Sequence, residues 1–145
     1  SAASDVYKRQ LIDRIEIRKD GVYLSTHLPE DTGSYKTWKS EELSEAYQRD
    51  GQKGLDREMF RVLYEYAALG DFHKSTARYH RIFNLPEAKA FHRECFEKIA
   101  AFEKSCSSPS EFWVYDREMR ERLYDRLAEK CGEFDRKHKH KEYER

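Results

Sequence analysis

The sequence predicts an α+β fold in which helix dominates: an N-terminal β-hairpin packed on a bundle of four to five helices. Hydrophobic residues alternate on both sides of Asp20-Gly21, as they do in a hairpin. Further along the chain they recur at spacings of three and four, the period of an amphipathic helix. Charged residues make up 39% of the 145-residue chain and aromatic residues 14%, a composition that suits helices with one apolar and one solvated face.

The hairpin is expected within "LIDRIEIRKDGVYLSTHL". Asp20-Gly21 is a strong signal for a two-residue turn because glycine tolerates positive φ and aspartate tolerates it better than most residues. In the predicted register Lys19 faces Val22 and Ile17 faces Leu24. One face is then apolar and consists of Ile15, Ile17, Val22 and Leu24. The other face carries Arg14, Glu16, Arg18, Tyr23, Ser25 and His27.

Three helices are expected after the loop "PEDTGSYKTW". Ser40 is predicted to cap a short helix in "SEELSEAYQRDG". Gly51 and Gly54 bracket a break, after which "LDREMFRVLYEYAALG" carries the wide apolar stripe of a central helix and ends at Gly70. A third helix, in "HKSTARYHRIF", is predicted to be capped by Ser75.

Two longer amphipathic helices are predicted in the C-terminal half. The first has Pro86 in its opening turn, where the missing N–H costs nothing, and its stripe consists of Ala88, Phe91, Cys95, Ile99 and Phe102. The second begins with Ser108 as N-cap, Pro109 in the first helical position and Glu111 completing a capping box. Its stripe consists of Phe112, Tyr115, Met119, Leu123, Leu127, Cys131 and Phe134.

We expect one domain over residues 11–134, between a non-native leader at residues 1–10 and a frayed basic tail at residues 135–145. The leader, "SAASDVYKRQ", resembles the read-through translation of a transposase-based sequencing adapter. Such peptides recur at the ends of proteins predicted from metagenome assemblies. The resemblance implies that residues 1–10 make few contacts with the core.

Charge and cysteine content narrow the function classes. Lys plus Arg and Asp plus Glu both number 28, which argues against a general polyanion binder but not against a local basic patch. The cysteines, an odd number without a CxxC pair, are Cys95, Cys106 and Cys131, so a reducing cytoplasm is the predicted compartment. No apolar run approaches membrane-spanning length, so no membrane partner is expected.

We recognise no catalytic constellation, and we therefore predict a protein that is not an enzyme and needs no cofactor or metal. The sequence contains no GxSxG, P-loop or GxGxxG motif. His92 and Cys95 form half of a zinc site, but a second close pair of ligands is missing. The "HKHK" stretch at residues 138–141 is expected to promote solubility rather than hold a metal.

Residues 74–93 are a candidate nucleic-acid-binding segment. Residues 71–93 hold five basic and two acidic side chains, a net charge of +3, whereas residues 41–70 carry −3. Arginine donors beside an aromatic ring can hold a phosphate backbone and stack a base. The candidate residues are Lys74, Arg78, Tyr79, His80 and Arg81. A solvated helix face paired with the preceding acidic segment is the simpler interpretation, and we favour it.

Tyr35 and Trp38 are the candidate residues for binding a partner protein, because exposed Tyr and Trp are typical anchors of interfaces. Alternatively, Trp38 packs ahead of the Ser40 cap and fastens the following helix to the hairpin. We favour this second role because a small core depends on large side chains.

The stretches "KDGVYLSTH" and "SYKTWKSEELSEAYQRDGQKGLDREMFRVLYEYA" resemble a group of small proteins from gut bacteria and their phages or mobile elements. The likeness covers roughly residues 13–75, and the group has no assigned activity and lends no catalytic residues. It implies an accessory protein of a phage or mobile element. We predict a non-enzymatic interaction protein that binds a host or element protein; the alternative is a nucleic-acid-binding regulator that uses residues 74–93.

Overall fold

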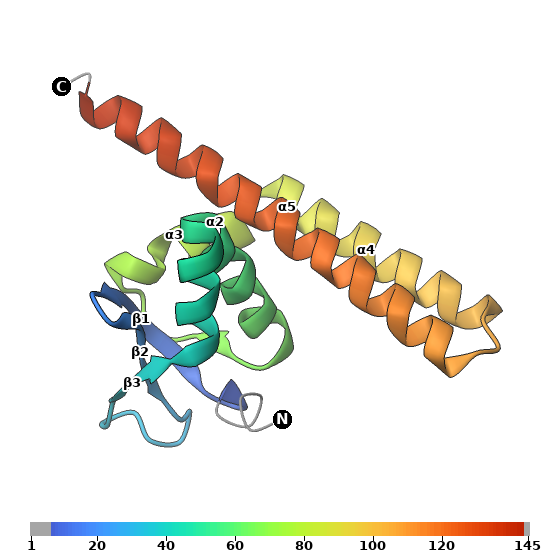
Figure 1. Cartoon of the computed structure of the whole chain (residues 1–145), viewed down its shortest axis with the longest axis horizontal. Coiled ribbons are helices and arrows are strands. Elements are labelled where there is room, and N and C mark those ends of the chain that lie inside the picture. Colours follow the sequence, from blue (N-terminus) through green and yellow to red (C-terminus); the bar gives the residue numbers. More distant parts are fainter. Residues whose placement is uncertain (1–6, 144–145) are drawn as a thin grey trace.

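The computed structural model describes residues 7–143, with side chains through His138. The fold is α+β and mostly helical, as the sequence predicts. Its elements in chain order are β1 (Leu11–Arg18), β2 (Gly21–His27), β3 (Lys36–Ser40), α2 (Glu41–Glu65), β4 (Ala68–Leu69), α3 (Lys74–Phe83), α4 (Pro86–Ser105) and α5 (Pro109–Tyr143). Figure 1 shows three layers: the sheet, then α2 and α3, then the antiparallel pair α4 and α5, which projects beyond the rest.

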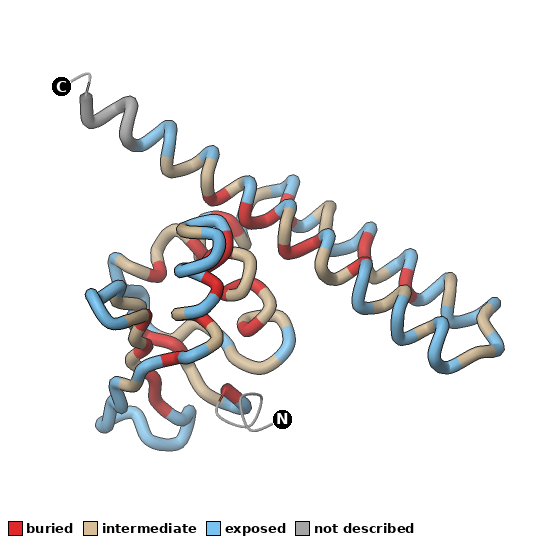
Figure 2. The backbone as a smooth tube through the Cα atoms, in the orientation of Figure 1, coloured by how far each residue is buried: buried red, intermediate tan, exposed pale blue. Residues whose placement is uncertain are grey.

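The sheet has the strand order β3-β2-β1-β4, and β4 alone pairs in parallel. Val22 and Leu24 of β2 face the helices and are fully buried. They share one hydrophobic cluster with Phe60 of α2 and Tyr79 of α3, and the cluster continues into α5. Figure 2 shows buried residues along α5 where it crosses the body and more exposed residues toward the loop that joins α4 to α5.

The N-terminal hairpin is confirmed, but its predicted register is wrong. Ile17 lies opposite Val22 and Ile15 opposite Leu24, so the turn is Lys19-Asp20, one residue earlier than expected. The turn that Asp-Gly signals needs positive φ at both of its residues, and only Gly21 has it, at +151°. Each partner shifts by two residues, an even number, and the predicted apolar and polar faces are therefore kept.

The third strand lies where the sequence predicts a loop. β3 pairs with β2 and places Trp38 opposite Leu24 on the core side. Thr37 and Lys39 lie on the other side of the strand and are exposed. A strand with only one inward apolar residue lacks the alternation by which strands are recognised, and its lysines suit the exposed edge of a sheet.

β4 replaces the predicted last turn of the central helix. After Glu65 the chain straightens, and the Ala68 N–H donates to the carbonyl of Gln10 at 3.2 Å. The Gly70 N–H donates to the carbonyl of Ile12 at 2.9 Å. Gly70 is therefore the point where the chain approaches β1, and it is not the helix cap that the sequence suggests.

The predicted helix starts are largely confirmed. The Ser40 hydroxyl accepts the Leu43 N–H at 3.3 Å, and the expected break falls at Gly51, which interrupts α2 with φ of +67°. The N-cap of α3 is His73 and not Ser75, because the His73 ring accepts the Ser75 N–H at 3.1 Å. The Ser75 hydroxyl instead accepts the backbone N–H of Ile15.

The α4–α5 hairpin follows the predicted stripes. Pro86 lies in the first turn of α4, and the Ser108 hydroxyl accepts the Glu111 N–H at 3.4 Å. The fully or nearly fully buried stripe residues are Ala88, Cys95, Ile99, Met119, Leu123, Leu127 and Cys131. Within the described residues the tail predicted to fray from residue 135 is helical, because α5 continues to Tyr143 and Asp135 accepts hydrogen bonds from α3. Residues 144–145 of that tail lie outside the described residues.

The expectation that residues 1–10 barely contact the core does not hold at Tyr7. Tyr7 is buried, its hydroxyl pairs with the hydroxyl of Ser40, and its ring centroid lies 5.5 Å from that of Trp38. This aromatic pair fills the space beside the start of α2. Residues 1–6 of the predicted leader lie outside the described residues.

The cysteines are free thiols: Cys95 and Cys131 are buried, and Cys106 is half-buried. Burial raises the pKa of Cys95 and of Cys131 above the ordinary thiol value. Across residues 7–143, no helix combines the length and apolar character needed to cross a membrane.

Candidate interaction site at the end of the helical hairpin

The α4–α5 hairpin is held to the body along only part of its length. Arg57 of α2 bonds Asp125 at 3.2 Å, and Arg61 bonds Glu121 at 2.8 Å. The turns of α5 that precede Glu121 pack on α4, and Figure 1 shows this part of the hairpin standing clear of the sheet, α2 and α3. A two-helix hairpin covers only one side of each helix, so apolar residues on the remaining sides meet solvent.

We define the hairpin end as the surface around the α4–α5 loop formed by Phe102, Ser110, Glu111, Trp113, Val114, Tyr115 and Glu118. Its geometry follows from the three-residue connection at 106–108, which makes the helices antiparallel neighbours. Phe102 then stacks on Tyr115 with ring centroids 4.2 Å apart and planes inclined by 15°. This stacked pair forms the apolar floor of the hairpin end.

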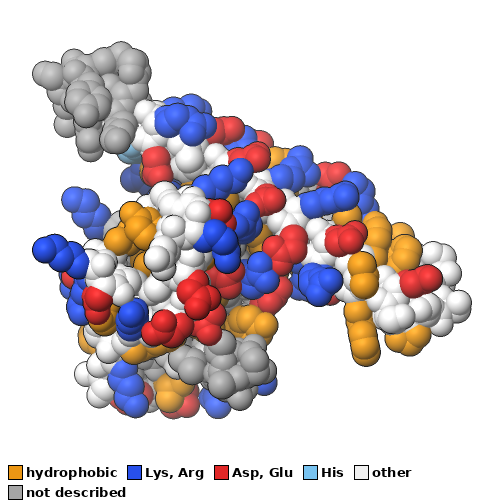
Figure 3. All heavy atoms as spheres, in the orientation of Figure 1, with side chains coloured by type: hydrophobic (Ala, Val, Ile, Leu, Met, Phe, Trp, Pro, Cys, Tyr) orange, Lys and Arg blue, Asp and Glu red, His pale blue; other side chains and the backbone are white. Residues whose placement is uncertain are grey.

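Two large apolar side chains in the first turns of α5 are exposed. Trp113 exposes 69% of its surface and Val114 46%. Figure 3 shows hydrophobic side chains gathered at this end of the molecule. An open hollow of about 410 Å³ is lined by Phe102, Ser110, Glu111, Val114, Tyr115 and Glu118. Exposed apolar surface of this kind is typical of protein-binding sites.

The rim of the hollow is acidic. Glu111 and Glu118 lie on the same face of α5, two turns apart, with Val114 and Tyr115 between them, and the lining contains no Lys or Arg. Among the residues with described side chains, neither carboxylate takes part in an ion pair. The hairpin end therefore combines an apolar hollow with unneutralised negative charge.

The structure places Arg78 and Tyr79 of the predicted basic segment inside the protein. Arg78 donates to the carboxylates of Asp56 and Asp135, and the buried Tyr79 hydroxyl donates to Asp56 at 2.6 Å. Burial alone would lower the pKa of Arg78, but the hydrogen bonds to Asp56 and Asp135 outweigh it and raise that pKa. Neither side chain is presented for stacking a base or gripping a phosphate backbone.

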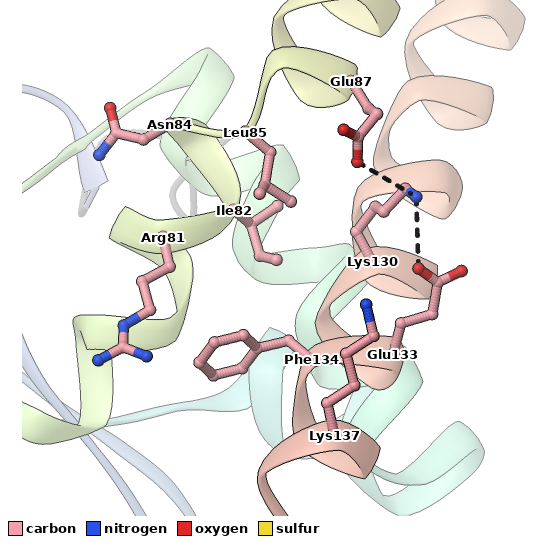
Figure 4. Close-up of a pocket in the computed structure, with 9 residues that line it drawn as sticks. All are labelled: Arg81, Ile82, Asn84, Leu85, Glu87, Lys130, Glu133, Phe134 and Lys137. Carbon is pink, nitrogen blue, oxygen red and sulfur yellow. Dashed lines mark hydrogen bonds and ion pairs between the residues drawn. The ribbon is translucent and has the colours of Figure 1, made fainter.

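The other three residues of that segment point in different directions. Lys74 is exposed at the first residue of α3, whereas the His80 ring lies 5.4 Å from that of Phe72. Arg81 borders a cleft of about 480 Å³ between α3, α4 and α5 (Figure 4), and its guanidinium lies over the Phe134 ring at 5.1 Å. The segment therefore does not form one continuous basic and aromatic surface.

The cleft beside Arg81 carries both signs of charge. Figure 4 shows Lys130 between Glu87 and Glu133, to which it is paired at 3.5 and 3.3 Å. Arg81 donates toward a ring nitrogen of His138 at 3.1 Å. Lys137 lines the same cleft and has no carboxylate partner among the described side chains. The mixture gives this cleft a weaker preference for either sign of ligand than the hairpin end has.

The two aromatic candidates of the predicted loop, Tyr35 and Trp38, differ in burial. Trp38 is half-buried, and its indole N–H donates to the Thr26 hydroxyl at 3.1 Å, so it serves the core as favoured. Tyr35 is exposed, with its ring edge-on to His27 at 5.9 Å between centroids.

Sequence reasoning missed the exposure of Trp113 and Val114, although the run "FWVY" contains the signal. Four consecutive helical residues cannot share one face, so some of them must meet solvent.

Comparisons of the chain with protein-family models, curated proteins and solved structures found no match.

Proposed function

We propose that this protein is a non-enzymatic binding module that captures a segment of another protein at the hairpin end. The observation that carries the proposal is the exposure of Val114, which lines the hollow together with the stacked Phe102 and Tyr115 rings. Trp113, the preceding residue of α5, adds exposed apolar surface outside the lining of the hollow. Tryptophan and tyrosine dominate the energetics of interfaces because they bury much area at little cost in side-chain freedom.

The charge of the rim defines the partner. Glu111 and Glu118 flank the apolar hollow without ion-pair partners in the described part of the chain, so a segment with a large apolar side chain between Lys or Arg residues fits best. The apolar side chain supplies burial, and the basic residues supply orientation and selectivity. Acidic or uncharged segments leave both carboxylates uncompensated.

The biological setting proposed with this function is the cytoplasm of a bacterial host, where the protein would serve a phage or mobile element. Support for the setting comes from the sequence resemblance over roughly residues 13–75 and from the free cysteines.

The emission of Trp113, which precedes Val114 in α5, tests whether a peptide covers the hairpin end. In a Trp38→Phe background, Trp113 is the only tryptophan, because the chain has two. Titration with a short amphipathic peptide that carries leucines flanked by lysines should shift this emission to the blue and saturate. The same peptide with glutamates in place of its lysines should bind at least about tenfold more weakly, because it meets Glu111 and Glu118 with like charge.

Charge reversal at the rim separates this proposal from nonspecific adhesion. The double variant Glu111→Lys/Glu118→Lys should exchange the two peptides' order of affinity. Glu97→Lys, an exposed and unpaired position on α4, is the matched control and should keep the original order. Equal affinity for both peptides, or an unchanged order in the double variant, would exclude the proposed partner chemistry.

The nucleic-acid alternative retains only Lys74 and Arg81 as exposed cations of its five candidates, together with the nearby Lys137. It requires a gel shift at low salt that weakens steeply as salt rises and weakens further in Lys74→Ala/Arg81→Ala. A shift with these properties, without binding of either peptide, would favour the alternative over the binding module.

A further inference from the structure

A buried Asp–His pair lies beneath the outer face of the sheet. A β-bulge in β1 inserts Asp13 between Ile12 and Arg14, where it has no partner residue on β2. One Asp13 oxygen lies 2.6 Å from Nδ1 of His27, and the side chains of both residues are more than nine-tenths buried. The pair fixes the orientation of the His27 ring from within the sheet.

The other oxygen of Asp13 positions the segment after β4. It accepts the Asp71 N–H at 3.2 Å. At Gly70 a Cβ atom would come within 2.1 Å of the same oxygen, so this approach requires glycine. The close approach brings Asp71 and Phe72 to the outer face of the sheet.

Two exposed aromatic rings line the pocket that results. Tyr35 exposes 58% of its surface and Phe72 68%, yet each ring has a histidine beside it. His27 meets Tyr35 edge-on, and His80 lies against Phe72 with centroids 5.4 Å apart. The pocket has a volume of about 430 Å³ and is lined by Asp13, Arg14, Ser25, Tyr35, Thr37, Asp71, Phe72 and His73.

The charges around this pocket favour a cation. The Asp71 carboxylate has no hydrogen-bond or ion-pair partner within the described side chains. Arg14, which also lines the pocket, lies 3.7 Å from the carboxylate of Glu16, which it shares with the closer guanidinium of Arg18. His73 uses Nδ1 in its bonds to Ser75. An unpaired carboxylate beside two aromatic rings is the arrangement that attracts organic cations.

We propose that this pocket binds the ammonium or guanidinium group of a lysine or arginine side chain presented by a peptide. The aromatic faces of Tyr35 and Phe72 would hold the cation, and Asp71 would neutralise its charge. The pocket lies on the sheet, whereas the hairpin end is at the opposite side of the molecule (Figure 1). The two sites are therefore tested independently.

The test is an NMR titration of the full chain with Nα-acetyl-lysine methylamide, its arginine counterpart and its norleucine counterpart. Norleucine has the apolar stem of lysine and no charge. We expect saturable shifts at the amides of Tyr35, Asp71 and Phe72 with the two cationic compounds and none with norleucine. Phe72→Leu should weaken binding by about 2- to 30-fold, the range expected from a cation–π contact. Asp71→Asn should also weaken it, because the cation loses the carboxylate that neutralises its charge.

Matched controls keep the test specific. Tyr47→Leu and Asp31→Asn make the same kinds of change at exposed sites outside the pocket and should leave the affinity unchanged. Amide spectra of α4 and α5 should be the same in all variants, which shows that loss of binding is not loss of fold. Binding of norleucine as tight as that of lysine, or full affinity in Asp71→Asn, would overturn the proposal. A further titration with n-butylammonium tests a free amine. If this amine binds and the lysine compound does not, the ligand is a free amine and the proposed peptide ligand is excluded.

Discussion

At the scale of single residues, Arg78 shows how a surface-like sequence becomes interior. It sits in "ARYHR", a stretch with two arginines, a histidine and a tyrosine, yet its guanidinium bridges Asp56 and Asp135. These partners are 22 and 57 positions away, on α2 and α5. Local sequence shows only neighbours at three and four positions along a helix. The pairing that decides the role of Arg78 is therefore invisible before the helices are packed.

Replacing Arg78 by alanine should destabilise the protein by about 3–5 kcal/mol, because the buried Asp56 carboxylate would lose its charge partner. Arg81→Ala removes the same kind of side chain from the next turn, where it is exposed, and should change the free energy of unfolding by less than about 0.5 kcal/mol. Urea unfolding at neutral pH measures both. Similar small effects would mean that water reaches Asp56 in the native state.

At the scale of elements, α2 depends on its interruption at Gly51. The residue has φ of +67° and ψ of −149°, a region that side-chain-bearing residues rarely occupy. The kink lets Gly54 approach the carbonyl of Ala46, where a Cβ atom would lie within 2.5 Å. The two halves of α2 can then each contact a different layer: the first half lies beside β2 and the second beside α5.

Gly51→Ala should therefore destabilise the protein by about 1–2 kcal/mol through backbone strain alone, since no atom lies within 4 Å of the new Cβ. Gly132→Ala is the matched control within regular helix α5, where the new methyl meets only the flexible end of Arg136. This substitution should stabilise the protein by up to about 1 kcal/mol, because alanine favours helix. Thermal melts of the two variants should thus move in opposite directions. A shift of both in the same direction would contradict the assigned role of Gly51.

The elements that sequence predicts best are those whose signals are local. The apolar stripes, the Ser40 and Ser108 caps, the break at Gly51 and the two hairpin faces all depend on residues close together in the chain. β3 and β4 do not, because an edge strand needs little apolar character and a two-residue parallel strand has no pattern of its own. The candidate sites share this limit. Tyr35 was a candidate from the sequence, but Phe72 was not. Phe72 reaches the same pocket because the chain at Gly70 passes close to β1.

At the scale of the whole molecule, charge is balanced in number and separated in space. The net charge is zero, yet the hairpin end places two unpaired carboxylates, and the pocket on the sheet one, beside aromatic rings. Both surfaces therefore suit cationic groups. With no net charge to steer a partner from a distance, recognition depends on contacts at these surfaces. Binding at either surface should consequently respond to salt far less than nucleic-acid binding would.

Wholly or partly buried tyrosines also join the layers of the molecule. Because of them we expect the folded protein to lose stability in alkali. Tyr7, Tyr64, Tyr79 and Tyr124 come from four different segments, and burial is the largest cause that raises the pKa of each, to about 12 for Tyr64. Unfolding returns each phenol to its ordinary pKa of 10.0, so above that pH the unfolded chain releases protons that the folded chain keeps.

Stability from these groups is thus fully present below pH 10 and falls as pH rises from 10 toward the folded pKa values. We expect the urea midpoint to begin to fall near pH 10 and to drop between about pH 10 and pH 12. Phenolate absorbance should then appear in two parts, first from exposed tyrosines and then together with the loss of helical circular dichroism. Tyr64→Phe removes one of these groups and should make the drop smaller while leaving its onset near pH 10. A midpoint unchanged up to pH 11 would show that the phenols ionise as freely in the folded protein as in the unfolded chain, and that the layers do not exclude water from them.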